Sequence, residues 1–283
     1  MGVKNPTTRE WLRALIEPAM ILKMAMYYYI ETNVKAILSG RILAPILNAN
    51  ELRDEAFGRF WVAFSALREE EPPTTQIQDA SATVSPQPSS NQPEGDSIKE
   101  VEMSSDLIPP ILSLASGITL DVGPGTGTQM PLLAKNGKIT SIYGAEPCRG
   151  LHSELKRRAE INGLGDRYTI LPCGVEKSEL GREMGKVGLI DSTHPGTDGL
   201  FDTIVTIRVL CSVPHLQTTV ADLYTLLKPG GKLLVVEHVV NPWQSPKGSI
   251  LARIMQGLYH MLGWRWFEGT CMVYVAGVFV KRQ

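Results

Sequence analysis

The fold of this chain is decided by residues 119–127, which read Thr-Leu-Asp-Val-Gly-Pro-Gly-Thr-Gly. A short apolar strand ends around Asp121, and glycines then occupy alternate positions at Gly123, Gly125 and Gly127. Glycine tolerates a positive φ and lets another molecule approach the backbone closely. A strand that runs into such a turn and then into a helix forms the nucleotide crevice at the carboxyl ends of α/β sheet strands.

The spacing of these glycines narrows the class of ligand. A dinucleotide or pyrophosphate loop has the pattern G-x-G-x-x-G or ends in G-K-[ST]. This loop is G-x-G-x-G, the next residue is Thr128, and no lysine directly follows the glycines. The pattern argues against a phosphate cradle and favours a nucleoside with a compact, uncharged linker, such as S-adenosylmethionine. A glycine-rich turn that only connects a strand to a helix is the alternative interpretation.

The downstream sequence contains the other strands that such a crevice needs. A second predicted strand ends near Glu146, about 20 residues beyond the glycines, where a carboxylate can accept hydrogen bonds from two ribose hydroxyls. A solvated loop acid is the alternative interpretation of Glu146. Strands alternating with helices imply a parallel sheet covered by helices on both faces. The predicted strands are 118–122, 139–144, 168–171, 203–208, 232–238 and 273–281, and the predicted helices include 151–162 and 249–262.

The glycine loop, the strand that ends near Glu146, and residues 201–206 and 226–237 together resemble the class I S-adenosylmethionine-dependent methyltransferases. The resemblance covers about residues 106–240 and implies a Rossmann-like, doubly wound and mostly parallel α/β sheet, with S-adenosyl-L-methionine as cofactor. Three further segments carry a closer resemblance: Arg-Val-Leu-Cys-Ser-Val at 208–213, Val-Glu-His-Val at 236–239 and Glu-Gly-Thr-Cys at 268–271. Together they resemble the methyltransferase-like seven branch of thiol methyltransferases and its fungal relatives. Members of that branch methylate small thiols and are often membrane-associated, and the ubiquinone and menaquinone methyltransferases are more distant cousins.

The resemblance also implies which residues contact the cofactor. Asp121 is expected to receive the methionyl amino group, and Glu146 to bind the ribose hydroxyls. Many relatives have an aspartate at the position of Gly174, so adenine recognition there must use the Val175 backbone or Glu176. The complete set of expected cofactor contacts is Asp121, Gly123, Gly125, Gly127, Glu146, Pro147, Gly174, Val175, Glu176 and Arg208.

Two histidines near strand ends, His215 and His238, are the candidate catalytic residues. Either imidazole can accept a proton from a thiol or a hydroxyl, and a structural or surface histidine is the alternative for each. A thiol is partly ionised near neutral pH, whereas a phenol or an aliphatic hydroxyl needs more help from a base. We therefore expect a small apolar acceptor with sulfur as the favoured atom. The alternatives are an O- or N-methyltransferase that tailors a secondary metabolite or quinone, and a catalytically silent methyltransferase fold that binds a membrane or a partner.

Composition sets the outer limits of function. The chain has 283 residues, a formal net charge of −1 and 43% hydrophobic residues. This near-neutral charge gives no excess of basic residues for binding a nucleic acid, so a DNA or RNA methyltransferase is not expected. Its four cysteines are widely spaced, without the Cys/His pattern of a zinc site, so no metal is expected. Free thiols fit a reducing compartment and a cytoplasmic location. Nothing in the sequence specifies an oligomeric state.

Three regions follow from the distribution of apolar residues. Residues 1–68 are predicted as a helical extension, with helical patterns at 14–30, 33–47 and 51–68. These helices either cover the substrate pocket or form a peripheral membrane anchor, because their longest uncharged run is far below the ~20 residues of a membrane span. Residues 69–105 are predicted as a disordered linker or insertion, since large apolar side chains are scarce there. The methyltransferase domain is expected to occupy 106–283. The proposed anchor residues are Met20, Met24, Met26, Tyr27, Tyr28 and Tyr29.

The C-terminal segment departs from the expected pattern. Nothing between residues 263 and 272 alternates like a strand. We therefore expect the usual sixth strand of the class to be missing, which places the last strand at the edge of the sheet.

Overall fold

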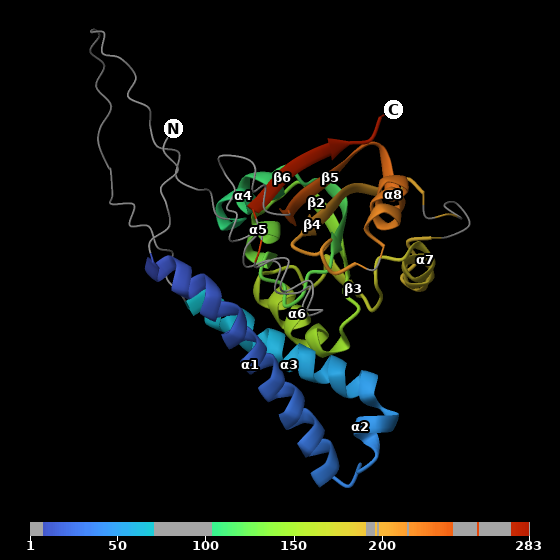
Figure 1. The fold of residues 1–283 in the computed structure, drawn as a ribbon. Coiled ribbons are helices and arrows are strands. Elements are labelled where there is room, and N and C mark those ends of the chain that lie inside the picture. Colours follow the sequence, from blue (N-terminus) through green and yellow to red (C-terminus); the bar gives the residue numbers. More distant parts are fainter. Residues whose placement is uncertain are drawn as a thin grey trace, which may run out of the picture.

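The computed structural model describes residues 8–70, 104–190, 196, 198–213, 215–239, 254 and 273–282. Within them, six strands form one sheet in the order β3-β2-β1-β4-β5-β6, in which only β6 is antiparallel to its neighbour (Figure 1). The strands are β1 (Gly117–Val122), β2 (Ile139–Ala145), β3 (Tyr168–Leu171), β4 (Phe201–Ile207), β5 (Leu227–Val239) and β6 (Val273–Val280). The helices are α1 (Thr8–Leu38), α2 (Ala44–Leu47), α3 (Ala49–Glu70), α4 (Ser104–Leu112), α5 (Met130–Lys135), α6 (Arg149–Ile161), α7 (Lys177–Lys186) and α8 (Leu216–Leu226).

The sheet separates two hydrophobic cores, as the predicted alternation of strands and helices requires. One core joins the sheet to α4, α5 and α6, and the other joins it to α7 and α8. Neighbouring residues of a central strand serve opposite cores: Leu233 of β5 packs on the α7 and α8 side and Leu234 on the other. Because both faces are covered there, the central strands β1 and β4 are buried or half-buried at every position rather than exposed at every second one.

The sheet confirms the predicted Rossmann-like, mostly parallel fold, and β6 lies at its edge. The parts of the sheet that the structure describes contain no strand beyond β6. The helix predicted at 249–262 lies outside the described residues except for Ile254, which is helical. The segment 263–272 also lies outside them. The predicted linker 69–105 does so as well, apart from its helical ends in α3 and α4.

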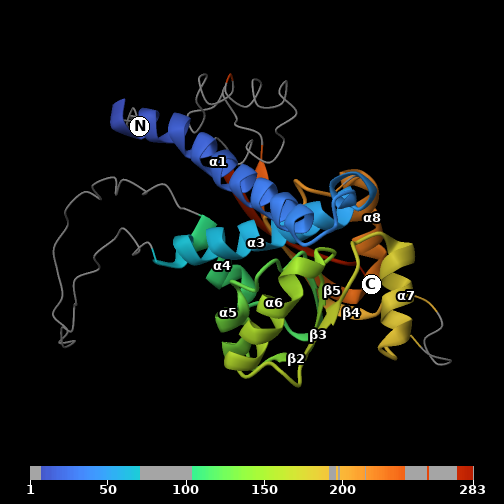
Figure 2. The same cartoon turned by 90° about the horizontal axis from the view of Figure 1, so that it is seen from below.

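The N-terminal extension is a helical hairpin in which α1 and α3 lie side by side (Figures 1 and 2). Arg59 of α3 joins the two helices through hydrogen bonds of 2.6 Å to Glu31 and 3.0 Å to Thr32. The helix predicted at 33–47 is wrong as a single unit. Residues 33–38 complete α1, and Gly40 then reverses the chain with a φ of +89° before the short α2. No helix among the described residues is both long and apolar enough to cross a bilayer.

Two glycines hold this hairpin against the rest of the molecule. Gly58 of α3 packs directly on Gly150 of α6, and a Cβ added at Gly58 would lie 2.8 Å from the Gly150 backbone. The Cys148 thiol, just before α6, lies 3.5 Å from the carbonyl oxygen of Asp54 in α3. The two helix backbones therefore meet where neither carries a side chain, which brings α3 to the carboxyl ends of β1 and β2.

Candidate active site

The glycine loop has the backbone conformation that its sequence predicts. Gly123, Gly125 and Gly127 have φ values of +59°, +61° and +81°, all in the region that favours glycine. The loop leaves the end of β1 and leads into α5, as a nucleotide crevice at the carboxyl end of a parallel sheet requires. The loop therefore lies at the edge of the sheet where the predicted site is expected.

The carboxyl group of Glu146 faces this loop from the end of β2. Its Oε2 accepts a hydrogen bond of 2.9 Å from the Gly125 N–H, and its Oε1 accepts one of 2.9 Å from the Cys148 N–H. The residue is only 5% exposed, and burial raises the pKa of the carboxyl although both backbone bonds lower it. A carboxylate has about four acceptor positions, so this geometry leaves acceptor capacity for hydroxyl donors.

Asp121, at the end of β1, is hydrogen-bonded by a side chain of β3, which lies two strands away in the sheet. The Tyr168 hydroxyl of β3 donates a hydrogen bond of 3.0 Å to Oδ2 of Asp121. Burial raises the pKa of Asp121 to about 6, although the bond from Tyr168 lowers it, and the nearby Glu146 raises it further. A buried acid of this kind favours a cationic partner, because such a partner restores part of the lost solvation.

Helix α3 covers the glycine loop. A Cβ added at Gly125 would lie 3.1 Å from the indole Nε1 of Trp61, and the Thr126 hydroxyl donates a 3.1 Å hydrogen bond to the Ser65 hydroxyl. Trp61 also stacks on Phe57, with ring centroids 5.7 Å apart. The sequence placed these aromatics on the helix predicted at 51–68 and offered covering of the substrate pocket as one of two roles for that helix, but it gave them no individual contact with the glycine loop. Only the docking of α3 on α6 brings them there.

A strained turn after β4 forms the opposite side of the loop. Arg208 has a φ of +56°, and among the described non-glycine residues it alone has a positive value. Such backbone strain persists only when the surrounding structure holds it, and it concentrates at functional sites. The next residue, Val209, packs closely on Gly123. A Cβ added at Gly123 would collide with the Cγ2 atom of Val209.

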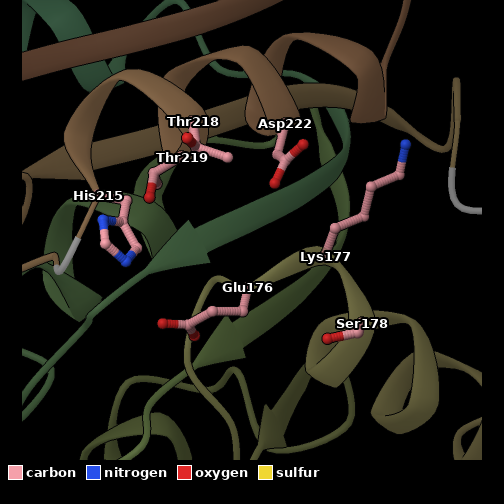
Figure 3. A pocket seen from close by; sticks show the side chains of 7 residues that line it. All are labelled: Glu176, Lys177, Ser178, His215, Thr218, Thr219 and Asp222. Carbon is pink, nitrogen blue, oxygen red and sulfur yellow. The ribbon is translucent and has the colours of Figure 1, made fainter.

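Of the predicted adenine-side residues, Glu176 lines a cavity between α7 and α8 (Figure 3). Its volume is about 250 Å³, and Glu176 and His215 both line it. The Glu176 carboxylate occupies the space that a side chain at Gly174 would enter, while Val175 is buried. Other residues that line the cavity are Lys177, Ser178, Thr218, Thr219 and Asp222.

The structure thus divides the predicted residues into two groups. The glycine loop, Asp121, Glu146 and Arg208 gather at the ends of β1, β2 and β4, and Pro147 is exposed beside them. Glu176 and His215 line the cavity between α7 and α8, and His215 is exposed at the start of α8. The His238 side chain lies outside the described residues, although its backbone pairs with Tyr274 in the sheet. Sequence reasoning gave no site role to Trp61, Gly144, Tyr168, Val209 or Glu237.

A family model for a methyltransferase domain matches residues 100–269, more than half of the chain. The chain therefore belongs to the S-adenosylmethionine-dependent methyltransferases of class I fold. Among curated relatives, the ubiquinone/menaquinone biosynthesis C-methyltransferases UbiE of Brucella canis and Brucella suis are each 32% identical over 91 residues. The match covers 29% of this chain and 34% of each relative, so it spans about a third of their length.

Solved structures with a similar fold are more distant in sequence. The [4+2]-cyclase SpnF is 17% identical with a TM-score of 0.42, over 62% of this chain and 80% of that one. The YcgJ protein from Bacillus subtilis is 16% identical with a TM-score of 0.41, over 56% of this chain and 58% of that one. A putative S-adenosyl-L-methionine-dependent methyltransferase from Methanococcus maripaludis is 17% identical with a TM-score of 0.38, over 64% of this chain and 89% of that one.

Proposed function

We propose that this protein transfers a methyl group from S-adenosylmethionine to a small apolar acceptor, and that the acceptor atom is a thiol sulfur. The observation that carries the proposal is the pair of buried carboxyls, Asp121 and Glu146, beside a glycine loop with positive φ angles. Burial raises the pKa of both acids, so the site favours a ligand that brings a cation and hydroxyl donors. S-adenosylmethionine brings both in its ammonium group and its ribose.

Each of these residues has a distinct part in holding the cofactor. Asp121 receives the methionyl ammonium group, and Glu146 accepts the ribose hydroxyls while keeping the Gly125 N–H in place. The covering indole of Trp61 keeps bulk water away from the loop. On the adenine side, the carboxylate of Glu176 stands in for the aspartate that relatives have at Gly174, and its position against Gly174 supports this role.

The chemistry asks little of the protein beyond binding and alignment. The bound cofactor supplies an electrophilic methyl group on a sulfonium, and alignment alone can lower the barrier by ~7–11 kcal/mol. The acceptor sulfur forms a bond to the methyl carbon, while the electron pair of the breaking carbon–sulfur bond stays with the cofactor. A thiol releases its proton to a base, for which we propose His238, with His215 as the second candidate. The resemblance to thiol methyltransferases supports sulfur.

A quinone precursor is the second candidate acceptor, and the specific observation that favours it is the similarity to UbiE, whose name specifies C-methylation in quinone biosynthesis. An O- or N-methyltransferase of secondary metabolism belongs with this alternative. The third alternative is a silent methyltransferase fold.

Calorimetry with S-adenosylmethionine separates the enzyme from the silent fold. We expect saturable binding by the full chain and at least tenfold weaker binding by a Glu146→Ala variant. No heat from the wild type at high micromolar cofactor would leave only the catalytically silent fold. A panel of small thiols, phenols, amines and quinone precursors then distinguishes the acceptors. Methylation confined to the phenols or quinones would remove the sulfur assignment.

We further propose that the enzyme is cytoplasmic and contacts an intracellular membrane through the N-terminal hairpin. Of the expected anchor residues on α1, Met20, Met26, Tyr27 and Tyr29 are exposed, and Met24 and Tyr28 are half-buried.

The tip of the hairpin adds a more strongly exposed apolar surface. Five large apolar side chains at this tip are exposed, and in Figure 1 the tip projects away from the sheet. The two cations near the tip are each paired with an acid, Lys35 with Glu31 at 2.7 Å and Arg41 with Glu51 at 3.8 Å. The exposed apolar side chains, rather than net charge, therefore support contact with a membrane interface. The tip residues, with their exposed fractions, are Leu38 (81%), Ile42 (69%), Leu43 (61%), Ile46 (77%) and Leu47 (75%).

Co-sedimentation with vesicles of phosphatidylcholine and phosphatidylserine tests this contact. We expect the full chain to sediment with the vesicles, and a variant with serine at positions 43, 46 and 47 to stay largely in solution. Leu67→Ser is the matched control, because Leu67 is also exposed but lies near the other end of α3. Equal sedimentation of the triple variant, or none by the wild type, would contradict the proposal.

A further inference from the structure

Glu237, near the end of β5, is a buried acid that none of the roles above uses. Its side chain is only 6% exposed. Its Oε1 accepts two hydrogen bonds of 3.1 Å, one from the Val209 N–H and one from the Leu210 N–H. These donors belong to the turn after β4, so a single oxygen joins the turn to the neighbouring strand.

The Glu237 carboxyl is desolvated in this position. Burial raises the pKa of its carboxyl to about 7, and the two backbone bonds, the Thr206 hydroxyl and the positive charge of Arg208 lower it. The second oxygen, Oε2, is buried without a hydrogen bond of good geometry, although the Thr206 hydroxyl is near enough to influence the carboxyl. Burying a carboxyl is energetically unfavourable. The presence of Glu237 at this position therefore points to a role in holding the turn.

The turn that Glu237 holds is strained and touches the glycine loop. It begins at Arg208 with a φ of +56°, and the Arg208 N–H still donates to the Val236 carbonyl oxygen at 2.9 Å. The next side chain, Val209, fills the space above Gly123. Glu237 therefore acts on the first loop glycine through one intermediate side chain.

We propose that Glu237 is a positioning residue for cofactor binding: its carboxyl fixes the turn at 208–210 so that Val209 supports the glycine loop at Gly123. The part of this inference that concerns binding rests on the proposed function, because it requires that the protein bind S-adenosylmethionine. On the opposite side, Glu146 holds the same loop through the Gly125 N–H. Two acids thus hold the glycine loop. Glu146 holds it by a direct hydrogen bond, and Glu237 holds it indirectly through Val209.

Hydrogen–deuterium exchange tests this role of Glu237 without cofactor. We expect Glu237→Ala to speed amide exchange at least tenfold in residues 208–213 and also in 119–127. Glu237→Gln keeps a carbonyl oxygen that accepts both bonds, so it should retain wild-type exchange. Glu183→Ala is the matched control, because Glu183 is an equally buried glutamate that lies in α7 and accepts a hydrogen bond from Lys186.

Calorimetry with S-adenosylmethionine supplies the second readout. We expect Glu237→Ala to weaken cofactor binding at least tenfold, with Glu237→Gln and Glu183→Ala within threefold of the wild type. Wild-type exchange in 119–127 together with wild-type affinity in Glu237→Ala would overturn the inference while leaving the proposed function intact. No cofactor binding by the wild type itself would end the proposed function, and the exchange experiment would still decide whether Glu237 holds the loop.

Val209→Ala keeps the inference testable if Glu237→Ala does not fold. This variant preserves the carboxyl and both of its hydrogen bonds but removes the methyl groups that face Gly123. Faster exchange in 119–127, with unchanged exchange in 208–213, supports the transmission through Val209. Wild-type exchange in both segments would overturn it.

Discussion

Tyr168 donates its hydroxyl hydrogen to Asp121 across an intervening strand, at a distance of 3.0 Å. The crossing is possible because Gly144 of β2, which pairs with Asp121 in the sheet, has no side chain. A Cβ at Gly144 would collide with the Tyr168 ring and hydroxyl. One glycine in the middle strand thus lets β3 control an acid on β1 that belongs to the candidate site.

Replacing Tyr168 with phenylalanine should raise the pKa of Asp121 above its present value of about 6, because the lost hydrogen bond favours the ionised acid. It should also cost about 1–3 kcal/mol of stability near neutral pH, since a buried carboxylate loses its donor. Urea denaturation at pH 7.5 measures the cost. Tyr143→Phe is the control, because that ring packs edge-on against Phe201. Equal stability of the two variants would contradict the prediction.

Replacing Asp121 with asparagine should stabilise the fold at pH 7.5. The pKa of Asp121 is about 6, against an ordinary value of 3.8, so the folded state binds this proton more tightly than the unfolded state. The resulting stability is present below pH 3.8 and is lost as the pH rises through 6, by about 3 kcal/mol in total. Asparagine stays neutral, so its advantage over aspartate should be larger at pH 7.5 than at pH 4.5 in urea denaturation. A stability difference that does not change with pH would rule this out.

The same substitution should weaken cofactor binding, because the methionyl ammonium group loses its counter-charge. Wild-type affinity for S-adenosylmethionine should fall as the pH is lowered from 7 to 5, since Asp121 becomes protonated over this range. The Asp121→Asn variant should bind more weakly and with a flatter pH profile. Calorimetry at three pH values measures both. Parallel pH profiles for the two proteins would assign the titration to another group.

Replacing Glu146 with alanine should weaken cofactor binding at least tenfold, because it removes a ribose acceptor and releases the Gly125 N–H. Glu146→Gln should bind with intermediate affinity, since its amide has one acceptor oxygen in place of two. The measurement is calorimetry on variants whose circular dichroism matches the wild type. Unchanged affinity in the alanine variant would refute the ribose role.

Replacing Gly58 with alanine should separate α3 from α6. The added Cβ would lie 2.8 Å from the Gly150 backbone, which cannot yield as a flexible side chain can. We expect a lower melting temperature and a red shift in tryptophan fluorescence, which a Trp61→Phe background should abolish because four other tryptophans also contribute to the signal. Gly185→Ala in α7 meets no atom within 4 Å and should be neutral or stabilising by up to about 1 kcal/mol. A Gly58→Ala variant as stable as this control would show that the helix contact can adapt.

Local sequence patterns were sufficient for the sheet and for the loop of the site. The glycines, the acids at strand ends and the apolar strands are close in sequence to what they determine, so the mostly parallel sheet and the edge strand β6 follow from them. The N-terminal helices were harder to predict. The apolar pattern at 33–47 continues across Gly40, where the chain in fact reverses, because helical periodicity does not report a single glycine turn.

The contacts between distant segments were decided only by the tertiary structure. Tyr168 reaches Asp121, Trp61 covers Gly125 and Glu237 holds Val209 through strand register and helix docking, which no local pattern encodes. Periodicity along the chain specifies which face of an element is buried. The particular atom that an element meets across that face depends on how all the elements pack together, and for that reason the partners of the buried acids emerged only from the folded molecule.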